Sequence, residues 1–340
     1  MIATSPEKVR QGMNLLGGER RPFLFAVDFE LSCGLLVEDP ASGREIFYSI
    51  QGQGNHPRKG LAVPMGQGRI DPQPESLDSY RRKFEVVQTG LSRGDSYLAN
   101  LTIKTPISCD LSLEEIFSLA DSPFQLFLPG RFVSFSPERF VAIAADGTIS
   151  TYPMKGTINA DVPEAEKTIL DDFKETAEHA TVVDLLRNDL SLSASSVRVK
   201  RYRYIDRVKT SQREILQVSS DIRGRLGDGF QGRLGDIVFR MLPAGSVSGA
   251  PKESTLDIIR RAEDGPRGFY TGVFGLYDGR TLDSGVLIRY IEEENGQMFF
   301  RSGGGITAYS SMEDEYLEAL EKIYLPFRPG DLEAASRRNG

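Results

Sequence analysis

Many short strand-like runs in this sequence follow one another through turns of two or three residues. The turns Asp278-Gly279 and Glu294-Asn295-Gly296 are of the kind that joins neighbouring antiparallel strands. Parallel strands need crossovers of a dozen residues or more, so turns this short favour an antiparallel α+β fold over a doubly wound parallel sheet. The expected strands are rich in β-branched and aromatic residues and cover Phe23–Glu30, Arg44–Ile50, Gly130–Ser134, Phe140–Ala144, Thr148–Tyr152, Arg198–Tyr204, Gly268–Tyr277, Gly285–Glu292 and Gln297–Ser302.

Segments with helical periodicity lie between these runs. They cover Ser76–Arg93, Leu113–Leu119, Pro163–Arg187, Gly235–Leu242, Lys252–Ala262 and Met312–Tyr324. A chain of 340 residues can form one large domain or two medium ones. The stretch Gly52–Gln73 resembles a linker, but a long surface loop explains it equally well. We expect one domain over residues 1–330, followed by a polar tail over residues 331–340 that frays.

The charge and the rare residue types exclude several classes of protein. The chain has 41 Lys and Arg residues against 48 Asp and Glu residues, and this net charge of −7 argues against nucleic-acid binding. No signal peptide and no apolar run of about 20 residues is present, so we expect a cytoplasmic protein without membrane contact. Cys33, Cys109, His56 and His179 are too few for a typical zinc site, so any metal would be bound by oxygen ligands.

Lys155 in YPMKGT follows a predicted strand and precedes a glycine. A lysine in this position could be a nucleophile or an anion clamp, or simply a solvated turn lysine. As a nucleophile it needs the neutral amine. Its usual pKa of about 10.4 would therefore have to be lowered by burial or by a neighbouring cation.

Two glycine-containing segments could bring the backbone close to an anion. The loop PAGSVSGAPK over residues 243–252 precedes a helix, which suggests either an anion site or an ordinary loop-to-helix turn. It does not have the glycine and lysine spacing of a phosphate-binding Walker loop. The glycines Gly303–Gly305 could form a backbone concavity for a carboxylate or phosphate, or a tight structural turn.

Acidic residues recur at helical spacing on two expected helices. Glu315, Glu318 and Lys322 share one helical face, and Glu175 and Glu178 share another. Such pairs are commonly solvated surface groups. If the two helices face one another, however, a carboxylate from each could bind Mg²⁺.

Three further charged features have alternative interpretations. Glu138 in SFSPERF could be a general acid with a raised pKa, or an exposed glutamate. Arg289 lies within the apolar run GVLIRYI and needs an anionic ligand, a structural ion pair or a route to water. The basic run Arg198–Lys209 alternates as an exposed strand would, and we interpret it as a solvated face.

Nine ordered motifs resemble the chorismate-utilising enzymes, and the match as a whole spans roughly residues 80 to 327. That family includes anthranilate synthase component I, aminodeoxychorismate synthase component I, isochorismate synthase and salicylate synthase. The resemblance implies the anthranilate synthase component I-like fold, a large domain of antiparallel sheets flanked by helices. The motifs are SPE at 136–138, PMKGT at 153–157, EH at 178–179, DLLRND at 184–189, PAGSVSGAPK at 243–252, YTGVFG at 270–275, LIR at 287–289, GGGI at 303–306 and EYLEALEK at 315–322.

The resemblance implies a role for each candidate residue. Glu178 and Glu318 match the family's Mg²⁺ ligands, and Glu315 and Glu175 lie in or near that group. Glu138 matches the general acid that assists departure of the chorismate 4-hydroxyl. The groups that match those receiving the substrate carboxylates are Arg289, Lys322, Tyr270, Gly156, Thr157 and the backbone of Gly303, Gly304 and Gly305.

Lys155 distinguishes among the activities of the family. Members that make anthranilate, isochorismate or salicylate typically have Ala before Gly-Thr, whereas Lys is characteristic of aminodeoxychorismate synthases. The implied reaction begins with attack of the Lys155 amine on C2 of chorismate and loss of the 4-hydroxyl. Ammonia then attacks C4 and expels the lysine, giving 4-amino-4-deoxychorismate for 4-aminobenzoate and folate synthesis. Leu98 stands where hydroxylating members have a lysine that activates water. Anthranilate synthase component I is the alternative.

The chain also departs from the family pattern. Gln217 in LQVSS stands where several members have a histidine, and no tryptophan-binding segment is recognisable before about residue 80. Feedback regulation by tryptophan is therefore not expected. Neither Cys33 nor Cys109 lies in a glycine-flanked elbow of the glutaminase kind. We therefore expect a separate glutamine amidotransferase subunit to supply ammonia in a heterodimer.

Overall fold

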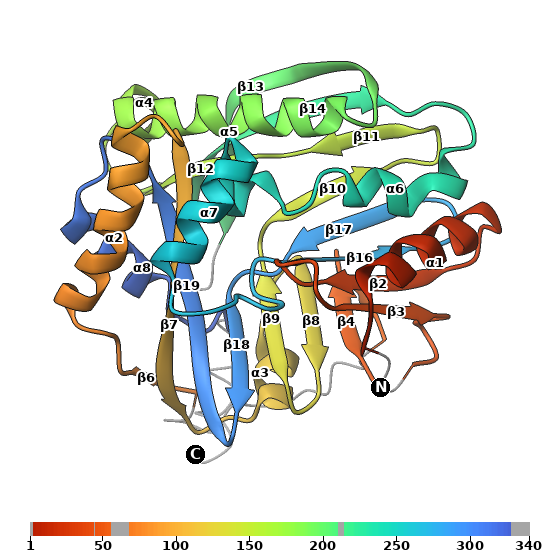
Figure 1. Ribbon diagram of the computed structural model, residues 1–340, viewed down its shortest axis with the longest axis horizontal. Coiled ribbons are helices and arrows are strands. Elements are labelled where there is room, and N and C mark those ends of the chain that lie inside the picture. The colour runs from red at the N-terminus through yellow and green to blue at the C-terminus, as the bar shows by residue number, and fades with distance from the viewer. Residues whose placement is uncertain (1–2, 44, 56–67, 210–213, 328–340) are drawn as a thin grey trace.

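The computed structural model describes residues 3–43, 45–55, 68–209 and 214–327, and within them the chain forms two large antiparallel sheets (Figure 1). Helices flank both sheets, which confirms the expected α+β class. The expected domain over residues 1–330 stays a prediction. Its tail over residues 331–340, His56 and part of the stretch Gly52–Gln73 lie outside the described residues.

The first sheet contains ten of the described strands. Its order is β1 (Ala3–Thr4), β3 (Gly34–Glu38), β2 (Phe23–Val27), β16 (Val273–Tyr277), β17 (Leu282–Val286), β10 (Arg139–Ile143), β11 (Thr148–Thr151), β14 (Glu214–Arg225) and β12 (Met154–Asn159), and β13 (Ser195–Lys209) also pairs with β14. The exposed outer side of β13 agrees with the solvated face that we expected for the basic run.

The second sheet contains nine described strands. Its order is β15 (Gly249–Ala250), β7 (Leu98–Cys109), β19 (Gln297–Ile306), β18 (Tyr290–Glu294), β9 (Phe132–Ser136), β8 (Phe124–Leu128), β4 (Phe47–Ile50) and β5 (Gln53–Gly54), and β6 (Ile70–Pro72) also pairs with β7. Side chains of both sheets share one hydrophobic core, in which Leu24 and Phe274 of the first sheet pack with Phe124 and Tyr290 of the second.

The helices begin where the sequence supplies caps. The side chain of Ser76 accepts a hydrogen bond at the start of α2, and Ser112 and Glu115 form a capping box at the start of α3. The helices are α1 (Pro6–Gly18), α2 (Leu77–Ser92), α3 (Leu113–Leu119), α4 (Ala165–Asp171), α5 (Phe173–Ser191), α6 (Leu234–Phe239), α7 (Lys252–Ala262) and α8 (Met312–Glu321), with 3₁₀ turns η1 (Phe230–Arg233) and η2 (Gly245–Val247). The predicted bounds of α3 and α7 are confirmed.

Helices α2, α7 and α8 gather beside β7 and β19 (Figure 1). Their apolar side chains, among them Tyr80 and Ile258, form a core cluster with Ala99, Leu101 and Ile306 of the two strands. This packing holds the end of β19 against three helices. Among the described helices, none is long and apolar enough to cross a membrane.

One predicted strand is wrong in an informative way. The apolar run Gly285–Glu292 forms the end of β17 and the start of β18, which belong to different sheets. Arg289 stands between them with φ at +50°. The run is largely apolar because the crossing between the sheets is itself buried, with Val286 and Leu287 fully covered. Arg289 is therefore at a crossing between sheets rather than in the middle of a strand.

Other expected elements also differ from the structure. The helix predicted over Pro163–Arg187 is two helices, because the chain is extended at Asp172, whose side chain caps α5. The triple glycine forms part of β19, so the tight-turn interpretation is wrong. Strands β7 and β14 were not predicted, since polar residues interrupt their apolar pattern.

Candidate functional site

The last residues of β19 form an open strand edge. The ladder between β18 and β19 ends at Tyr290 and Arg301, whereas β7 pairs with β19 as far as Ile306. Along Gly303–Gly305, no described strand pairs with the edge that faces away from β7. On this edge the Gly303 carbonyl accepts a 2.7 Å hydrogen bond from Lys322 Nζ. The backbone here can hydrogen-bond to side chains or a ligand.

The glycines of β19 let charged groups come unusually close to the strand. A Cβ placed on Gly304 would lie 3.3 Å from Glu315 Oε2 and 3.6 Å from Glu318 Oε1. A Cβ placed on Gly305 would lie 3.2 Å from Lys155 Nζ and 3.9 Å from Glu178 Oε2. Lys155 of β12 and Glu178 of α5 therefore approach one face of β19 at Gly305, and the glutamates of α8 approach the opposite face at Gly304. We call Gly303–Gly305 and the side chains around them the glycine-strand site.

Lys155 belongs to β12 rather than to a turn. Its Nζ lies 3.3 Å from Glu178 Oε2, and its side chain is 24% exposed. The pairing of β12 with β14 shifts register between Lys155 and Thr157, and Gly156 between them has φ at +75°. A Cβ on Gly156 would lie 3.3 Å from Glu175 Oε2. The solvated-turn interpretation of Lys155 is wrong, because the lysine faces the acids of α5.

The charges around Lys155 favour its ammonium form. Burial lowers the pKa of Lys155, but the carboxylates of Glu178, Glu318 and Glu175 together outweigh burial, so that the pKa is raised. The lowered pKa that a nucleophile requires is therefore not found in this arrangement of charges. Burial, assisted by Glu178 and Glu318, raises the pKa of Glu175.

The acids have donor groups that suit a hard cation. Glu178 is 5% exposed, and its Oε1 is buried without a hydrogen-bond partner among the described residues. Carboxylate oxygens are the ligands that Mg²⁺ prefers. Lys155 contacts Glu178, and Lys322 Nζ lies 2.7 Å from Glu318 Oε1. In the described part of the chain, no three His, Cys, Asp or Glu side chains are already grouped to hold a metal. The donor chemistry fits Mg²⁺, but the groups are not gathered around one point.

Glu138 lies between β9 and β10, where the loop of residues 243–252 reaches it. Ser246 in this loop donates its hydroxyl hydrogen to Glu138 Oε1, and the Glu138 N–H donates to Ser136 Oγ at 3.1 Å. Burial raises the pKa of Glu138, against the opposing effects of Ser246 and of nearby cations, which include Lys155. The loop of residues 243–252 thus brings a hydroxyl to Glu138, a contact that the sequence pattern did not predict.

The lysine of the same loop has a structural partner. Lys252 Nζ contacts Asp189 Oδ1 at 2.8 Å and donates to the Met241 carbonyl at 2.6 Å. The Asp189 carboxylate is buried at the end of α5. This contact joins the start of α7 to α5, and the Asp189 carboxylate neutralises the charge of Lys252 within the fold.

The residues expected to receive substrate carboxylates lie at different depths. Arg289 Nε is 3.5 Å from the Tyr324 hydroxyl, and its guanidinium lies over the Tyr324 ring at 5.5 Å. Tyr270 is buried, and burial raises its pKa to about 12. Thr157 is exposed and pairs with Gln217 of β14. Arg289 and Lys322 both act electrostatically on Glu138, which places these two cations near the glycine-strand site.

His179 follows Glu178 on α5 and faces β14. Its Nε2 forms a 2.7 Å hydrogen bond with Ser220 Oγ, and its Nδ1 is buried without a described partner. Burial first, and then the charges of Arg203 and Lys155, lower the pKa of His179 to about 4. The imidazole is therefore neutral at pH 7 and anchors α5 to the sheet.

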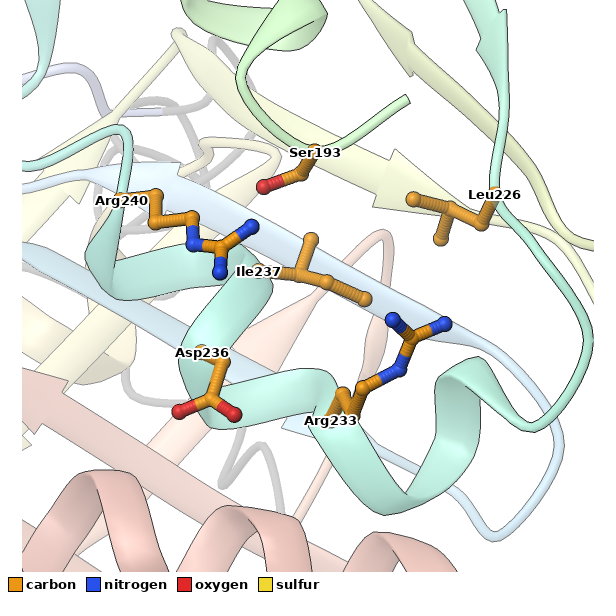
Figure 2. A pocket seen from close by; sticks show the side chains of 6 residues that line it. All are labelled: Ser193, Leu226, Arg233, Asp236, Ile237 and Arg240. Atoms are coloured by element: carbon orange, nitrogen blue, oxygen red, sulfur yellow. The ribbon is translucent and has the colours of Figure 1, made fainter. Parts of the chain in front are cut away.

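Figure 2 shows a separate small pocket at α6, lined by Ser193, Leu226, Arg233, Asp236, Ile237 and Arg240. None of these residues belongs to the glycine-strand site. Arg233 and Arg240 donate to backbone carbonyls of Asp228 and Leu192, and Asp236 pairs with Arg10. These charges hold neighbouring segments together.

Comparisons with known proteins identify several relatives of this chain. Two relatives are named as uncharacterised PabA-like proteins. The one from Haemophilus influenzae is 48% identical to this chain, over 94% of this chain and 96% of that protein. The one from Pasteurella multocida is 47% identical, over 93% of this chain and 97% of that protein. Aminodeoxychorismate synthase component 1 of Salmonella typhimurium is 32% identical over 72% of this chain and 56% of that enzyme. The chain thus spans about half the length of that synthase.

Two solved structures share the fold. Anthranilate synthase component I from Streptococcus pneumoniae has a TM-score of 0.63 at 24% identity, over 76% of this chain and 59% of that one. The menaquinone-specific isochorismate synthase from Escherichia coli has a TM-score of 0.70 at 15% identity, over 95% and 82%. The family model described as chorismate binding enzyme matches residues 49–328. The chain therefore belongs to the chorismate binding enzyme family.

Proposed function

We propose that this chain is an aminodeoxychorismate synthase component I, a transferase that converts chorismate and ammonia into 4-amino-4-deoxychorismate for 4-aminobenzoate and folate synthesis. The observation that carries the proposal is the position of Lys155. Its Nζ would lie 3.2 Å from a Cβ on Gly305 and lies 3.3 Å from Glu178, within the glycine-strand site of a chorismate binding enzyme. The proposal places the enzyme in the cytoplasm, without nucleic acid or membrane.

The proposed reaction has two displacements. The neutral amine of Lys155 attacks C2 of chorismate, the ring double bonds shift, and the 4-hydroxyl leaves as water with a proton from Glu138. Ammonia then attacks C4, the double bonds shift back, the C2–nitrogen bond breaks, and the incoming nitrogen loses one proton. Lys155 must lose a proton before the attack, since the surrounding acids favour its ammonium. The raised pKa of Glu138 suits a proton donor.

The substrate carboxylates would be received by cations and by the backbone. Arg289 and Lys322 supply positive charge. The free edge of the segment Gly303, Gly304 and Gly305 supplies the N–H groups of Gly303 and Gly305, because the backbone groups of successive strand residues alternate between the two edges. Gly156, Thr157 and Tyr270 complete the proposed set around the substrate. The absence of side chains on the glycines leaves room for a ligand against the strand.

Glu178 and Glu318 would bind Mg²⁺, with Glu315 and Glu175 beside them. The buried, unpartnered Oε1 of Glu178 among the described groups supports this assignment. When bound, Mg²⁺ supplies positive charge that offsets the substrate carboxylate and the glutamates. Lys155 and Lys322 currently contact two of these glutamates and would change partners.

A glutamine amidotransferase subunit would supply the ammonia in a heterodimer. The relative from Salmonella typhimurium is named as a component 1, which supports a second component. Burial raises the pKa of both Cys33 and Cys109, so neither thiol resembles the activated nucleophile of a glutaminase.

The product formed with chorismate, Mg²⁺ and an ammonium salt tests the proposal. We expect 4-amino-4-deoxychorismate as the main product, identified by chromatography and mass spectrometry. Anthranilate as the main product would contradict the proposal in favour of anthranilate synthase component I. A relative from Haloarcula marismortui is named as an anthranilate synthase component 1, and it is 36% identical to this chain over 72% of this chain and 52% of that enzyme.

A further inference from the structure

Asn100, near the start of β7, carries a polar atom without a structural role. Its Oδ1 is buried and has no hydrogen-bond partner within the part of the chain that the structure describes. Buried acceptors are rarely left in this state, because an unmade hydrogen bond costs about 1–3 kcal/mol. Its carboxamide oxygen is therefore available to accept a hydrogen bond from a ligand.

The pairing of β7 with β19 shows which way Asn100 points. Asn100 lies directly opposite Gly305. Side chains of opposite residues in an antiparallel pair leave the sheet on the same face, with Cβ atoms about 4.5–5.5 Å apart. On Gly305 that Cβ would lie 3.2 Å from Lys155 Nζ and 3.1 Å from Leu98 Cδ1. Leu98 precedes Asn100 by two residues and shares its face. Asn100 thus lies on the face where Lys155 stands.

The main chain of Asn100 is held firmly. Its N–H donates to the Ser248 carbonyl at 2.8 Å, and its carbonyl accepts from Arg267 Nη2 at 2.6 Å. Arg267 is 1% exposed and also pairs with Glu263 at 2.6 Å. Both backbone groups of Asn100 therefore have hydrogen-bond partners, which fixes the position of the residue. Its side-chain oxygen has no hydrogen-bond partner among the described residues.

We propose that the Asn100 carboxamide oxygen accepts a hydrogen bond from ammonia and orients the ammonia lone pair toward the substrate. This inference rests on the proposed function. An amide oxygen accepts a hydrogen bond but is too weak a base to remove a proton. Water would need deprotonation to attack, whereas neutral ammonia already has a nucleophilic lone pair. Leu98, two residues away on the same face, also has no group that could remove a proton from water. This part of the site therefore suits ammonia.

The test compares Asn100→Leu with the unchanged enzyme under varied ammonium concentration. Leucine has a similar volume but no acceptor. We expect the KM for ammonia to rise by about tenfold, the effect of one lost hydrogen bond, while the KM for chorismate changes little. In the absence of ammonia, the covalent adduct between Lys155 and the substrate should still form and be visible by mass spectrometry. That adduct shows that the variant is folded and performs the first displacement.

Thr105→Val is the matched control on the same strand. Thr105 Oγ1 is also buried without a partner among the described atoms, but Thr105 pairs with Phe300, five residues from Gly305. We expect its KM for ammonia to equal that of the unchanged enzyme. If Asn100→Leu does not fold, the smaller Asn100→Ser should show the same rise. An unchanged KM for ammonia in a folded Asn100 variant would overturn the inference and leave the proposed function standing. An unchanged enzyme that does not use ammonia would overturn both.

Discussion

At the scale of single residues, the glycine-strand site depends on where charges are placed and where side chains are missing. Gly304 and Gly305 allow Glu315 and Lys155 to come within about a van der Waals contact of the strand. Lys155 is held beside Glu178, which stabilises its ammonium. The charges therefore favour the protonated form of the proposed nucleophile, and the proposed reaction requires that the Lys155 amine first lose a proton.

Replacing Lys155 removes the proposed nucleophile. For Lys155→Ala we expect the rate of 4-amination to fall to roughly a thousandth or less, because the covalent route is lost. The rate is measured by product formation from chorismate and ammonium salt. Lys104→Ala is the control. Lys104 lies on β7, outside the proposed machinery, and pairs with Glu292 and Glu294 of β18. Unchanged turnover in Lys155→Ala would remove the nucleophile assignment.

The hydroxyl of Ser246 tunes the proposed general acid. Ser246 donates to Glu138, which stabilises the carboxylate and lowers its pKa. Without that donor the pKa of Glu138 rises further. Glu138 must be protonated to act, so the alkaline limb of the kcat/KM profile should move to higher pH in Ser246→Ala. Other groups that act on Glu138 keep their charges in this variant: Lys155, Arg289 and Lys322.

Ser248→Ala provides the control for this pH profile, because the Ser248 hydroxyl donates to the Ala244 carbonyl instead. Its alkaline limb should stay where it is in the unchanged enzyme. A shift of the Ser246→Ala limb toward lower pH would show that Glu138 is not the titrating acid.

At the scale of elements, one buried arginine joins the parts that carry the site. Arg267 donates to the carbonyls of Val247 in η2 and Asn100 in β7, and it pairs with Glu263 just after α7. Val247 follows Ser246, and Asn100 lies opposite Gly305. Arg267 therefore links the position of Ser246, the partner of the proposed general acid, to that of the glycine strand.

Removing this arginine leaves Glu263 buried without its cation. We expect Arg267→Met to lower the free energy of unfolding by about 3–5 kcal/mol, as measured by urea denaturation. The double variant with Glu263→Gln should recover part of this loss, because glutamine is uncharged and can still accept from the Thr102 N–H. Arg260→Met, which removes an exposed pair with Asp257, should cost less than about 1 kcal/mol. Equal losses in Arg260→Met and Arg267→Met would contradict the linking role.

At the scale of the whole molecule, the chain crosses repeatedly between two sheets, and the site forms from segments that are distant in sequence. Lys155 comes from the first sheet, the glycines come from the second, and the glutamates come from α5 and α8. The shared core packs Phe274 of the first sheet with Phe124 of the second, which keeps the two sheets in contact. The geometry of the site is thus a consequence of how the sheets and helices pack.

Local patterns in the sequence were enough for several elements. The helical patterns over Leu113–Leu119 and Lys252–Ala262 predict α3 and α7 with the bounds that the structure has. Short turns such as Asp278-Gly279 indicate the antiparallel arrangement, because neighbouring strands must then pair in opposite directions. These signals act over a few residues, so no knowledge of distant contacts is needed.

The sequence by itself therefore determined the α+β class, many of the elements and, by resemblance, the family and its candidate residues. Only the tertiary structure decided that Gly303–Gly305 are a strand edge, that Arg289 stands at a crossing between sheets and that Ser246 reaches Glu138. It also decided that Asn100 shares a face with Lys155. The physical reason is that strand register, burial and the approach of charges depend on contacts between distant segments, which local residue patterns do not encode.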